Sequence, residues 1–266
     1  MFLIIMVIVL IFILGNVFYL LILPAKHEKE CKNRVFLDFQ ENKEEALRGV
    51  VGIVPESEIN GLSSYKGIGS GVIFDKKGDT YYAVTAKHVL GDDSKLKIFT
   101  RDTKFMGQTI NVDEGVNFEI PDEEFYQSLI DSKIEYVSLK DDLAILSFQD
   151  EKDLTVLDFD SKEININDKI MVIGHPEGNR YKDTYGYIKS ELEIIQFKKS
   201  GEKQRLIKHD AYMKPGNSGG VSLNKDKRIV GINVGGSFNI FGYYYEGYMI
   251  PYDIILDNIN NWRRNV

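Results

Sequence analysis

The sequence contains very little cysteine and histidine. Its 266 residues include one cysteine, Cys31, and four histidines. No internal disulfide can form, which excludes a small scaffold held together by disulfides. The clustered Cys/His spacing of a structural zinc site is also absent. We therefore expect neither a metal ion nor an organic cofactor.

The chain also lacks a basic block. The formal net charge is -7, and no run of Lys and Arg exceeds a few residues. A nucleic-acid-binding protein normally presents a basic face, so this function is disfavoured. Hydrophobic residues make up 43% of the chain and charged residues 27%, which is typical of a globular protein with a sizeable core.

Charged side chains are missing from residues 1–23, "MFLIIMVIVLIFILGNVFYLLIL". A helix of this length can cross the ~30 Å hydrocarbon core of a bilayer. The alternative is a cleaved signal peptide. The apolar run is too long for one, no Lys or Arg precedes it, and no A-x-A site follows. We predict an uncleaved transmembrane anchor over 1–23, followed by a charged juxtamembrane stalk over 24–46.

The basic residues after the apolar run bear on the side of the membrane on which the rest of the chain lies. Lys26, Lys29, Lys32 and Arg34 all follow the apolar run. The positive-inside rule would place the remainder of the chain in the cytoplasm.

From about residue 47 the sequence consists of short apolar, β-branched runs separated by Gly, Asp and Asn turns. There is no alternation of strands with helices and no internal repeat, so we predict an all-β domain. The acidic segment 111–133 is predicted to be an irregular insertion loop with one helical turn. Apolar residues at helical spacing predict an amphipathic C-terminal helix over about 251–264. The "GIGSG" glycines have no following helix or Lys-Ser/Thr, so they indicate a strand and turn rather than a phosphate loop.

Acyl transfer by serine needs a general base, a carboxylate that orients the base, and donors for the oxyanion. Among the histidines, His27 lies in the charged stalk, His175 in a Gly/Pro turn ("IGHPEG") and His209 in a strand ("IKHDAY"). His88, in "VTAKHVL", stands where a strand ends. The sheet would hold such a histidine while its ring faces a cleft. Taken alone, each histidine is equally compatible with a structural role.

The sequence also offers a candidate for the orienting carboxylate and one for the nucleophilic serine. Asp142 in "KDDLAILSF" directly precedes an apolar strand, and Ser218 lies in "KPGNSGG". Either stretch alone is an ordinary strand start or turn signal. The order His88, Asp142, Ser218 matches one of the chain orders in which this triad occurs, so together they indicate an acyl-transfer site.

These three residues lie within a longer series of motifs. The series runs, in chain order, "GIGSGVIFD", "VTAKHVL", "DDLAIL", "MVIGHPEG" and "HDAYMKPGNSGG" followed by "RIVGINVGG". In this order they resemble the trypsin-like (chymotrypsin-fold) serine proteases, in particular the bacterial branch of HtrA-like proteases and glutamyl endopeptidases. The similarity covers about residues 48–260. It implies a protease domain over 47–266 with two six-stranded antiparallel β-barrels, at about 47–150 and 165–250.

The resemblance also implies roles for individual residues. His88 would be the general base and Ser218 the nucleophile. Asp142, rather than Asp141, would orient His88, because the family's aspartate directly precedes the apolar pair. The backbone N–H groups of Gly216 and Ser218 would form the oxyanion hole.

The sequence departs from the family's motifs at positions that bear on activation and on substrate specificity. Asn217 replaces the aspartate that pairs with a newly cut N-terminus in digestive relatives, so we expect no activation by N-terminal cleavage. Asn233 stands where glutamyl endopeptidases carry histidine, which argues against glutamate specificity. The specificity pocket is expected to involve Tyr212 or Met213 together with Asn233 and Gly235. We expect no peptide-binding (PDZ) domain after the protease domain.

The sequence thus predicts a membrane-anchored serine endopeptidase acting on peptides or unfolded proteins. The alternative is a catalytically silent, membrane-tethered peptide-binding module of the same fold; a third reading is an esterase of small acyl compounds. By the family resemblance the domain would face the extracytoplasmic side, which conflicts with the placement of Lys and Arg.

Overall fold

The computed structural model describes most of the chain from residue 37 to 265. The described part leaves out residues 42, 60, 61, 66, 92–94, 114, 115, 177–180, 198–200 and 239–243. The predicted anchor at 1–23 and most of the stalk therefore lie outside the described residues. No helix within the described part is both long and apolar enough to cross a membrane.

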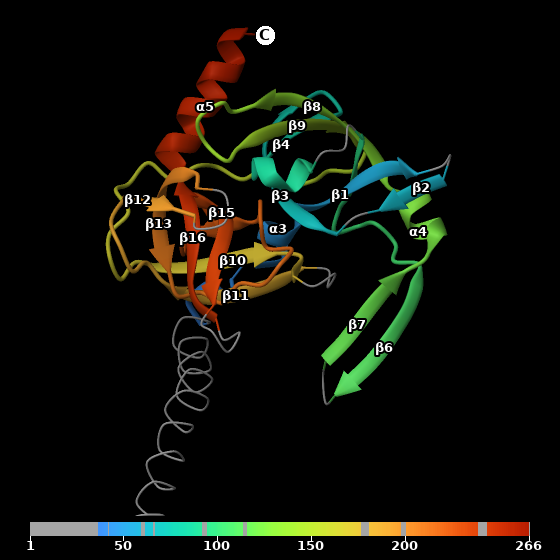
Figure 1. The fold of residues 1–266 in the computed structure, drawn as a ribbon, viewed down its shortest axis with the longest axis horizontal. Coiled ribbons are helices and arrows are strands. Elements are labelled where there is room, and N and C mark those ends of the chain that lie inside the picture. Colours follow the sequence, from blue (N-terminus) through green and yellow to red (C-terminus); the bar gives the residue numbers. More distant parts are fainter. Residues whose placement is uncertain are drawn as a thin grey trace, which may run out of the picture.

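The first sheet closes into a barrel (Figure 1). Its seven strands follow the order β2-β1-β3-β4-β9-β8-β5, and an additional pairing of β1 with β5 joins the ends of a six-strand ring. Strand β2 extends this ring as the partner of the outer part of β1. The strands are β1 (Val50–Ile59), β2 (Leu62–Tyr65), β3 (Gly69–Lys77), β4 (Thr80–Thr85), β5 (Lys95–Phe99), β8 (Ile130–Val137) and β9 (Ala144–Gln149).

The second sheet also has seven strands, but it stays open. Its order is β11-β10-β14-β15-β16-β13-β12, and no ladder joins its two ends among the residues described. The predicted second six-stranded barrel is therefore wrong; this sheet is a half-barrel. Its strands are β10 (Lys169–Gly174), β11 (Lys182–Tyr187), β12 (Glu193–Gln196), β13 (Lys203–His209), β14 (Val221–Leu223), β15 (Ile229–Phe238) and β16 (Tyr244–Pro251).

A side chain takes the place of a ladder where the second sheet would close. The carboxylate of Asp210 accepts the backbone N–H of Tyr187 at 2.6 Å, and the Asp210 N–H donates to the Tyr187 carbonyl at 3.1 Å. Next to this contact, the residue after β11 forms an isolated bridge with β13, between Ile188 and His209, and the Lys189 N–H donates to the Lys208 carbonyl at 2.8 Å. Because a carboxylate satisfies the backbone donor, a continuing strand pair is not needed there.

Segment 111–133 is more regular than its sequence predicts. Strands β6 (Gly107–Asp113) and β7 (Val116–Pro121) form a separate two-stranded hairpin that projects from the body (Figure 1). The predicted helical turn is α4 (Glu123–Gln127), capped by the Asp122 carboxylate, which accepts the Phe125 N–H at 2.9 Å. The alternation of polar and apolar residues in "VNFEI" is typical of a strand.

The residues that precede the first barrel lie against the second sheet. Phe39 of the short helix η2 (Leu37–Phe39) is fully buried and packs on Tyr185, with ring centroids 5.7 Å apart. Asp38 pairs with Lys169 at 2.6 Å. Lys43, at the start of α3 (Lys43–Arg48), pairs with Asp183 at 2.8 Å. The entering chain is thus attached to β10 and β11.

The predicted C-terminal helix is confirmed as α5 (Tyr252–Asn265). It follows the last strand of the second sheet, yet its far end packs on the first barrel. Trp262 lies 6.2 Å from Phe74 and 5.1 Å from Tyr82, measured between ring centroids. The helix therefore connects both halves of the molecule.

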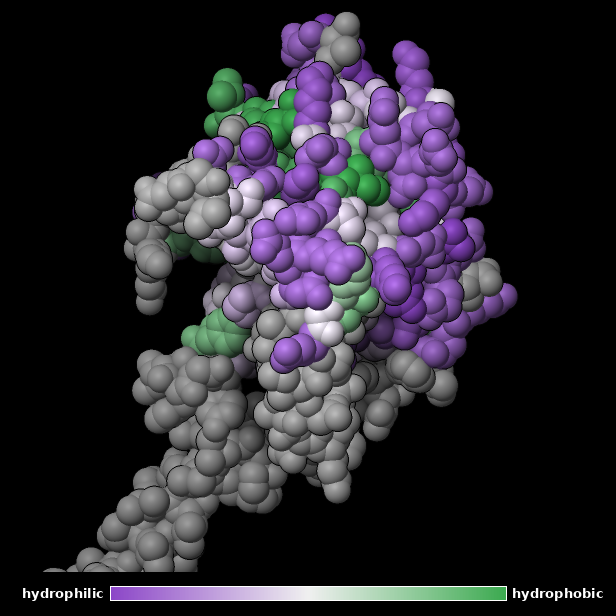
Figure 2. Space-filling model, turned by 90° about the vertical axis from the view of Figure 1, so that its right-hand side faces the viewer, coloured by the Kyte–Doolittle hydropathy of each residue, from purple (hydrophilic) through white to green (hydrophobic). Residues whose placement is uncertain are grey.

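Most large apolar side chains of the strands are buried, in one core that spans both sheets and a smaller cluster within the second. The face shown in Figure 2 is mainly hydrophilic, with separate hydrophobic patches. The large apolar side chains that remain most exposed include Leu139, Ile194 and Tyr245.

Trp262→Ala tests the connection made by α5. Trp262 is only 7% exposed, so its truncation is expected to lower the free energy of unfolding by roughly 3–5 kcal/mol. The matched control is Asn261→Ala, an exposed position on the same helix, which is expected to stay within about 0.5 kcal/mol of wild type. Urea titration measures both, and equal stabilities of the two variants would contradict a bridging role for α5.

Candidate active site

His88 is placed by the end of β4. The strand stops at Thr85, Ala86 stays extended, and η3 (Lys87–Leu90) begins. Val89 and Leu90 are buried, while the His88 side chain is 47% exposed. The turn is therefore fixed by its apolar residues, and its imidazole remains accessible to a substrate.

Asp142 uses both carboxylate oxygens on His88. Its Oδ2 lies 2.6 Å from His88 Nδ1, and its Oδ1 accepts the His88 backbone N–H at 2.9 Å. The Asp142 side chain is only 16% exposed. A carboxylate in this position holds the proton on Nδ1 and leaves Nε2 as the basic nitrogen.

The neighbouring carboxylate has different partners. Asp141 accepts from Asn258 Nδ2 on α5 at 2.9 Å and lies 3.5 Å from Arg205 of β13. The Asp142 N–H donates to the Gln204 side chain, also on β13, at 3.2 Å. The loop that carries both aspartates is thus held from the second sheet and from α5.

The Ser218 loop consists of two consecutive turns. The Asn217 N–H donates to the Lys214 carbonyl at 3.0 Å, and the Gly220 N–H donates to the Asn217 carbonyl at 2.9 Å. Gly216 and Gly219 have φ values of +103° and +79°, a region that a side chain disfavours. A Cβ on Gly219 would lie 2.2 Å from Thr85 Oγ1, so the loop packs against the strand end that leads to His88.

Both sheets hold this loop. Ser70 of β3 donates its N–H to the Ser218 carbonyl at 2.8 Å, and Asn233 of β15 accepts the Gly219 N–H at 2.7 Å. The N–H groups of Gly216 and Ser218 donate to none of the described backbone carbonyls. They are the two groups predicted for an oxyanion hole.

The four residues predicted for the specificity pocket differ in exposure. Met213 and Asn233 are buried, at 3% and 0% exposure. Tyr212 is half-buried, and its ring packs edge-on against Tyr244 at 5.0 Å. Gly235 is also half-buried, and a Cβ added there would meet no atom within 4 Å. Tyr212 and Gly235 are thus the two of the four that solvent reaches.

Asn233 is part of a buried network behind the Ser218 loop. Its Oδ1 accepts from Ser222 Oγ at 2.9 Å and lies 3.1 Å from His209 Nε2. Its Nδ2 donates to the Gly220 carbonyl at 3.0 Å. Burial lowers the pKa of His209 to about 4, against the opposing effects of the Asn233 hydrogen bond and the Asp210 charge. At neutral pH His209 is therefore uncharged, and because its Nε2 faces the Asn233 Oδ1, that nitrogen is the donor.

The two remaining histidines are His27 and His175. His27 falls outside the described residues. His175 is fully buried and contacts Ser70, with Nδ1 3.1 Å from Ser70 Oγ. Sequence reasoning missed Ser70 and Gln204. A serine within an apolar strand is the signal that could have identified Ser70, because buried hydroxyls need partners.

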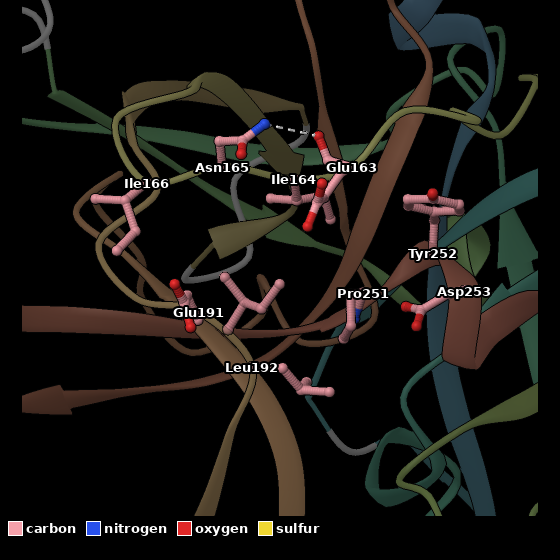
Figure 3. Close-up of a pocket in the computed structure, with 10 residues that line it drawn as sticks. Glu163, Ile164, Asn165, Ile166, Glu191, Leu192, Pro251, Tyr252 and Asp253 are labelled. Carbon is pink, nitrogen blue, oxygen red and sulfur yellow. Dashed lines mark hydrogen bonds between the residues drawn. The ribbon is translucent and has the colours of Figure 1, made fainter.

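A surface hollow of about 470 Å³ lies on the second sheet, and none of His88, Asp142 or Ser218 lines it. Figure 3 shows Glu163, Glu191 and Asp253 spread around it, with Asn165 Nδ2 donating to the Glu163 carbonyl. The hollow contains carboxylates but no nucleophile or histidine. The residues predicted for the catalytic site therefore lie away from this hollow.

Residues 69–232 match the trypsin-like peptidase domain family. This match covers more than half of the chain, and the chain belongs to that family.

Among curated proteins, the chain is similar to "Serine protease HtrA-like" proteins of Staphylococcus aureus. It is 28% identical to that of strain bovine RF122 over 173 residues, which are 62% of this chain and 20% of the relative. It is 26% identical to that of strain MRSA252 over 204 residues, 72% of this chain and 24% of the relative. The chain thus spans about a fifth to a quarter of the length of these relatives.

The buried His209 predicts a specific dependence of stability on pH. Its pKa is about 4 in the fold and ordinarily 6.5, so between these values the unfolded chain binds the extra proton. Its effect on stability is favourable above pH 6.5 and is lost as the pH falls towards 4, by roughly 3 kcal/mol.

His209→Gln retains a donor but does not titrate in this range. In urea titrations from pH 7.5 to 4.5, wild type is expected to lose more stability than His209→Gln. Parallel curves for the two proteins would contradict the assignment.

Proposed function

We propose that this protein is a serine endopeptidase that uses His88, Asp142 and Ser218. The observation that carries the proposal is the pair of hydrogen bonds that His88 donates to Asp142, at 2.6 and 2.9 Å. A carboxylate that accepts hydrogen bonds from both the ring and the backbone of an accessible histidine orients that histidine as a base. Family membership and the glycine-rich loop around Ser218 support the same role.

The reaction follows from these positions. Ser218 Oγ attacks the scissile carbonyl while His88 Nε2 takes its proton, and Asp142 stabilises the resulting imidazolium. The N–H groups of Gly216 and Ser218 donate to the oxyanion. His88 then protonates the leaving amine, which departs and leaves an acyl-enzyme. A water molecule loses a proton to His88, attacks the ester and releases the acid, and the proton returns to Ser218.

For specificity, we propose that the pocket is lined by Tyr212 and Gly235. The buried Asn233 amide bonds inward to Ser222, His209 and Gly220. It offers no donor to a substrate carboxylate, which argues against glutamate specificity. Asn217 is 2% exposed and uncharged, so we propose that no newly cut N-terminus is needed for activity. The expected substrates are peptides or unfolded proteins.

Labelling with a fluorophosphonate probe tests the nucleophile. Wild type is expected to be labelled, and Ser218→Ala is expected to remain unlabelled. Asp142→Asn is expected to lower the turnover of fluorescein-casein by about 10⁴-fold, because the wrong tautomer of His88 is then favoured. Asp141→Asn is the matched control and should retain turnover. A folded wild type that binds peptides but neither reacts nor cleaves would instead support the silent binding module.

We further propose that residues 1–23 anchor the protein in a membrane, with the protease domain on the extracytoplasmic side. The uncharged apolar run supports the anchor. The resemblance to HtrA-like proteases supports the extracytoplasmic side. The Lys and Arg residues after the run argue for the opposite side.

Proteolysis of intact cells decides between the two sides. Proteinase K added to cells that express the full chain is expected to degrade the domain, while a cytoplasmic marker stays intact. Protection of the domain until the cells are lysed would place it inside. Recovery of the full chain in the soluble fraction after lysis would contradict the anchor.

A further inference from the structure

Ser70 of β3 contacts the Ser218 loop at two points although it belongs to the other sheet. Its N–H donates to the Ser218 carbonyl at 2.8 Å, and its hydroxyl donates to the Gly216 carbonyl at 2.7 Å. Its own carbonyl accepts from Thr85 Oγ1 at 2.6 Å. Ser70 is fully buried and is therefore not a substrate contact. It contacts the same two residues whose N–H groups are proposed to bind the oxyanion.

His175 completes the hydrogen bonds of the Ser70 hydroxyl. A serine hydroxyl has one donor and two acceptor lone pairs. The donor is used on Gly216, and one lone pair accepts the His175 backbone N–H at 3.0 Å. The other lone pair faces His175 Nδ1 at 3.1 Å. All three positions are satisfied when His175 carries its proton on Nδ1.

Aromatic rings hold the His175 side chain in this orientation. Its ring lies edge-on to Phe99 of the first barrel, with centroids 4.8 Å apart, and 4.4 Å from Tyr181. Its backbone also limits the loop, because a Cβ on Gly216 would lie 2.2 Å from the His175 carbonyl oxygen. The turn after β10 and the strand β3 thus meet at Gly216.

Gly216 needs such external contacts. A glycine samples positive and negative φ about equally, so nothing intrinsic to the residue fixes φ at +103°. The direction of its N–H depends on that angle. Once the Gly216 carbonyl is held by Ser70, rotation that would turn the N–H away from the oxyanion costs a buried hydrogen bond.

We propose that Ser70 and His175 are positioning residues that hold the Gly216 and Ser218 N–H groups in the geometry of an oxyanion hole. This inference rests on the proposed endopeptidase function. It assigns a role to the "GIGSG" and "IGHPEG" stretches that the triad leaves unexplained.

The test compares kcat and KM for fluorescein-casein in the full chain. Removal of one oxyanion donor costs about 10²–10³-fold in kcat. Ser70→Ala leaves both N–H groups present but less well held, and a fall in kcat of about 10- to 100-fold with little change in KM is expected. His175→Leu should have the same effect. His175→Asn, whose Nδ2 can donate where Nδ1 did, should recover most of the activity.

Two further measurements separate positioning from general damage. The deshielded proton between His88 and Asp142 in the NMR spectrum is expected to persist in Ser70→Ala, since that pair is untouched. Ser147→Ala is the matched control: it removes another buried hydroxyl, which donates to Glu135 at 2.7 Å, and kcat should not change. Thermal melting establishes that each variant is folded at the assay temperature.

The outcomes are distinguishable. If wild type cleaves casein and folded Ser70→Ala retains its kcat, or loses no more than Ser147→Ala, the positioning role is wrong while the proposed function stands. An effect on KM alone, loss of the NMR signal, or failure of His175→Asn to recover activity also overturns it. If wild type neither cleaves casein nor takes up the fluorophosphonate, the proposed function itself is wrong.

Discussion

The arrangement of the site depends on one hydrogen bond between the two sheets, from the Ser70 N–H to the Ser218 carbonyl at 2.8 Å. A loop of two turns with three glycines has little conformational preference of its own. Its shape must come from its surroundings: Ser70 and Thr85 on the first barrel, Asn233 on the second sheet. Ser218 therefore lies where the two sheets meet, and the conformation of its loop depends on how the sheets pack against each other.

The contact between His88 and Asp142 shows the same dependence in the other direction. His88 and Asp142 both belong to the first barrel, yet the Asp142 N–H is held by Gln204 of the second sheet. Asp141, one residue earlier, is held by α5 through Asn258. Each half of the molecule thus supplies groups that hold candidate site residues of the other half. Neither half alone contains all the residues of the proposed site.

The sequence was sufficient for the class of fold and the C-terminal helix, because strand texture and helical spacing are local signals. It was not sufficient to predict that the second sheet stays open, because there the Asp210 side chain, rather than a strand partner, accepts the Tyr187 N–H. For the site, chain order and motif context predicted His88 and Asp142, which lie in contact. The inward orientation of Asn233 and the role of Ser70 depend on contacts between distant segments, which spacing does not encode.

The attachment of the entering chain to the second sheet has a mechanical consequence. Asp38 is paired with Lys169, the first residue of β10, and the residue after the last one of that strand is His175. A force applied to the chain before residue 38 is borne first by this ion pair and by the Phe39–Tyr185 contact. The load then runs along one six-residue strand. A pull on the entering chain is thereby coupled through β10 to His175, whose carbonyl packs against Gly216.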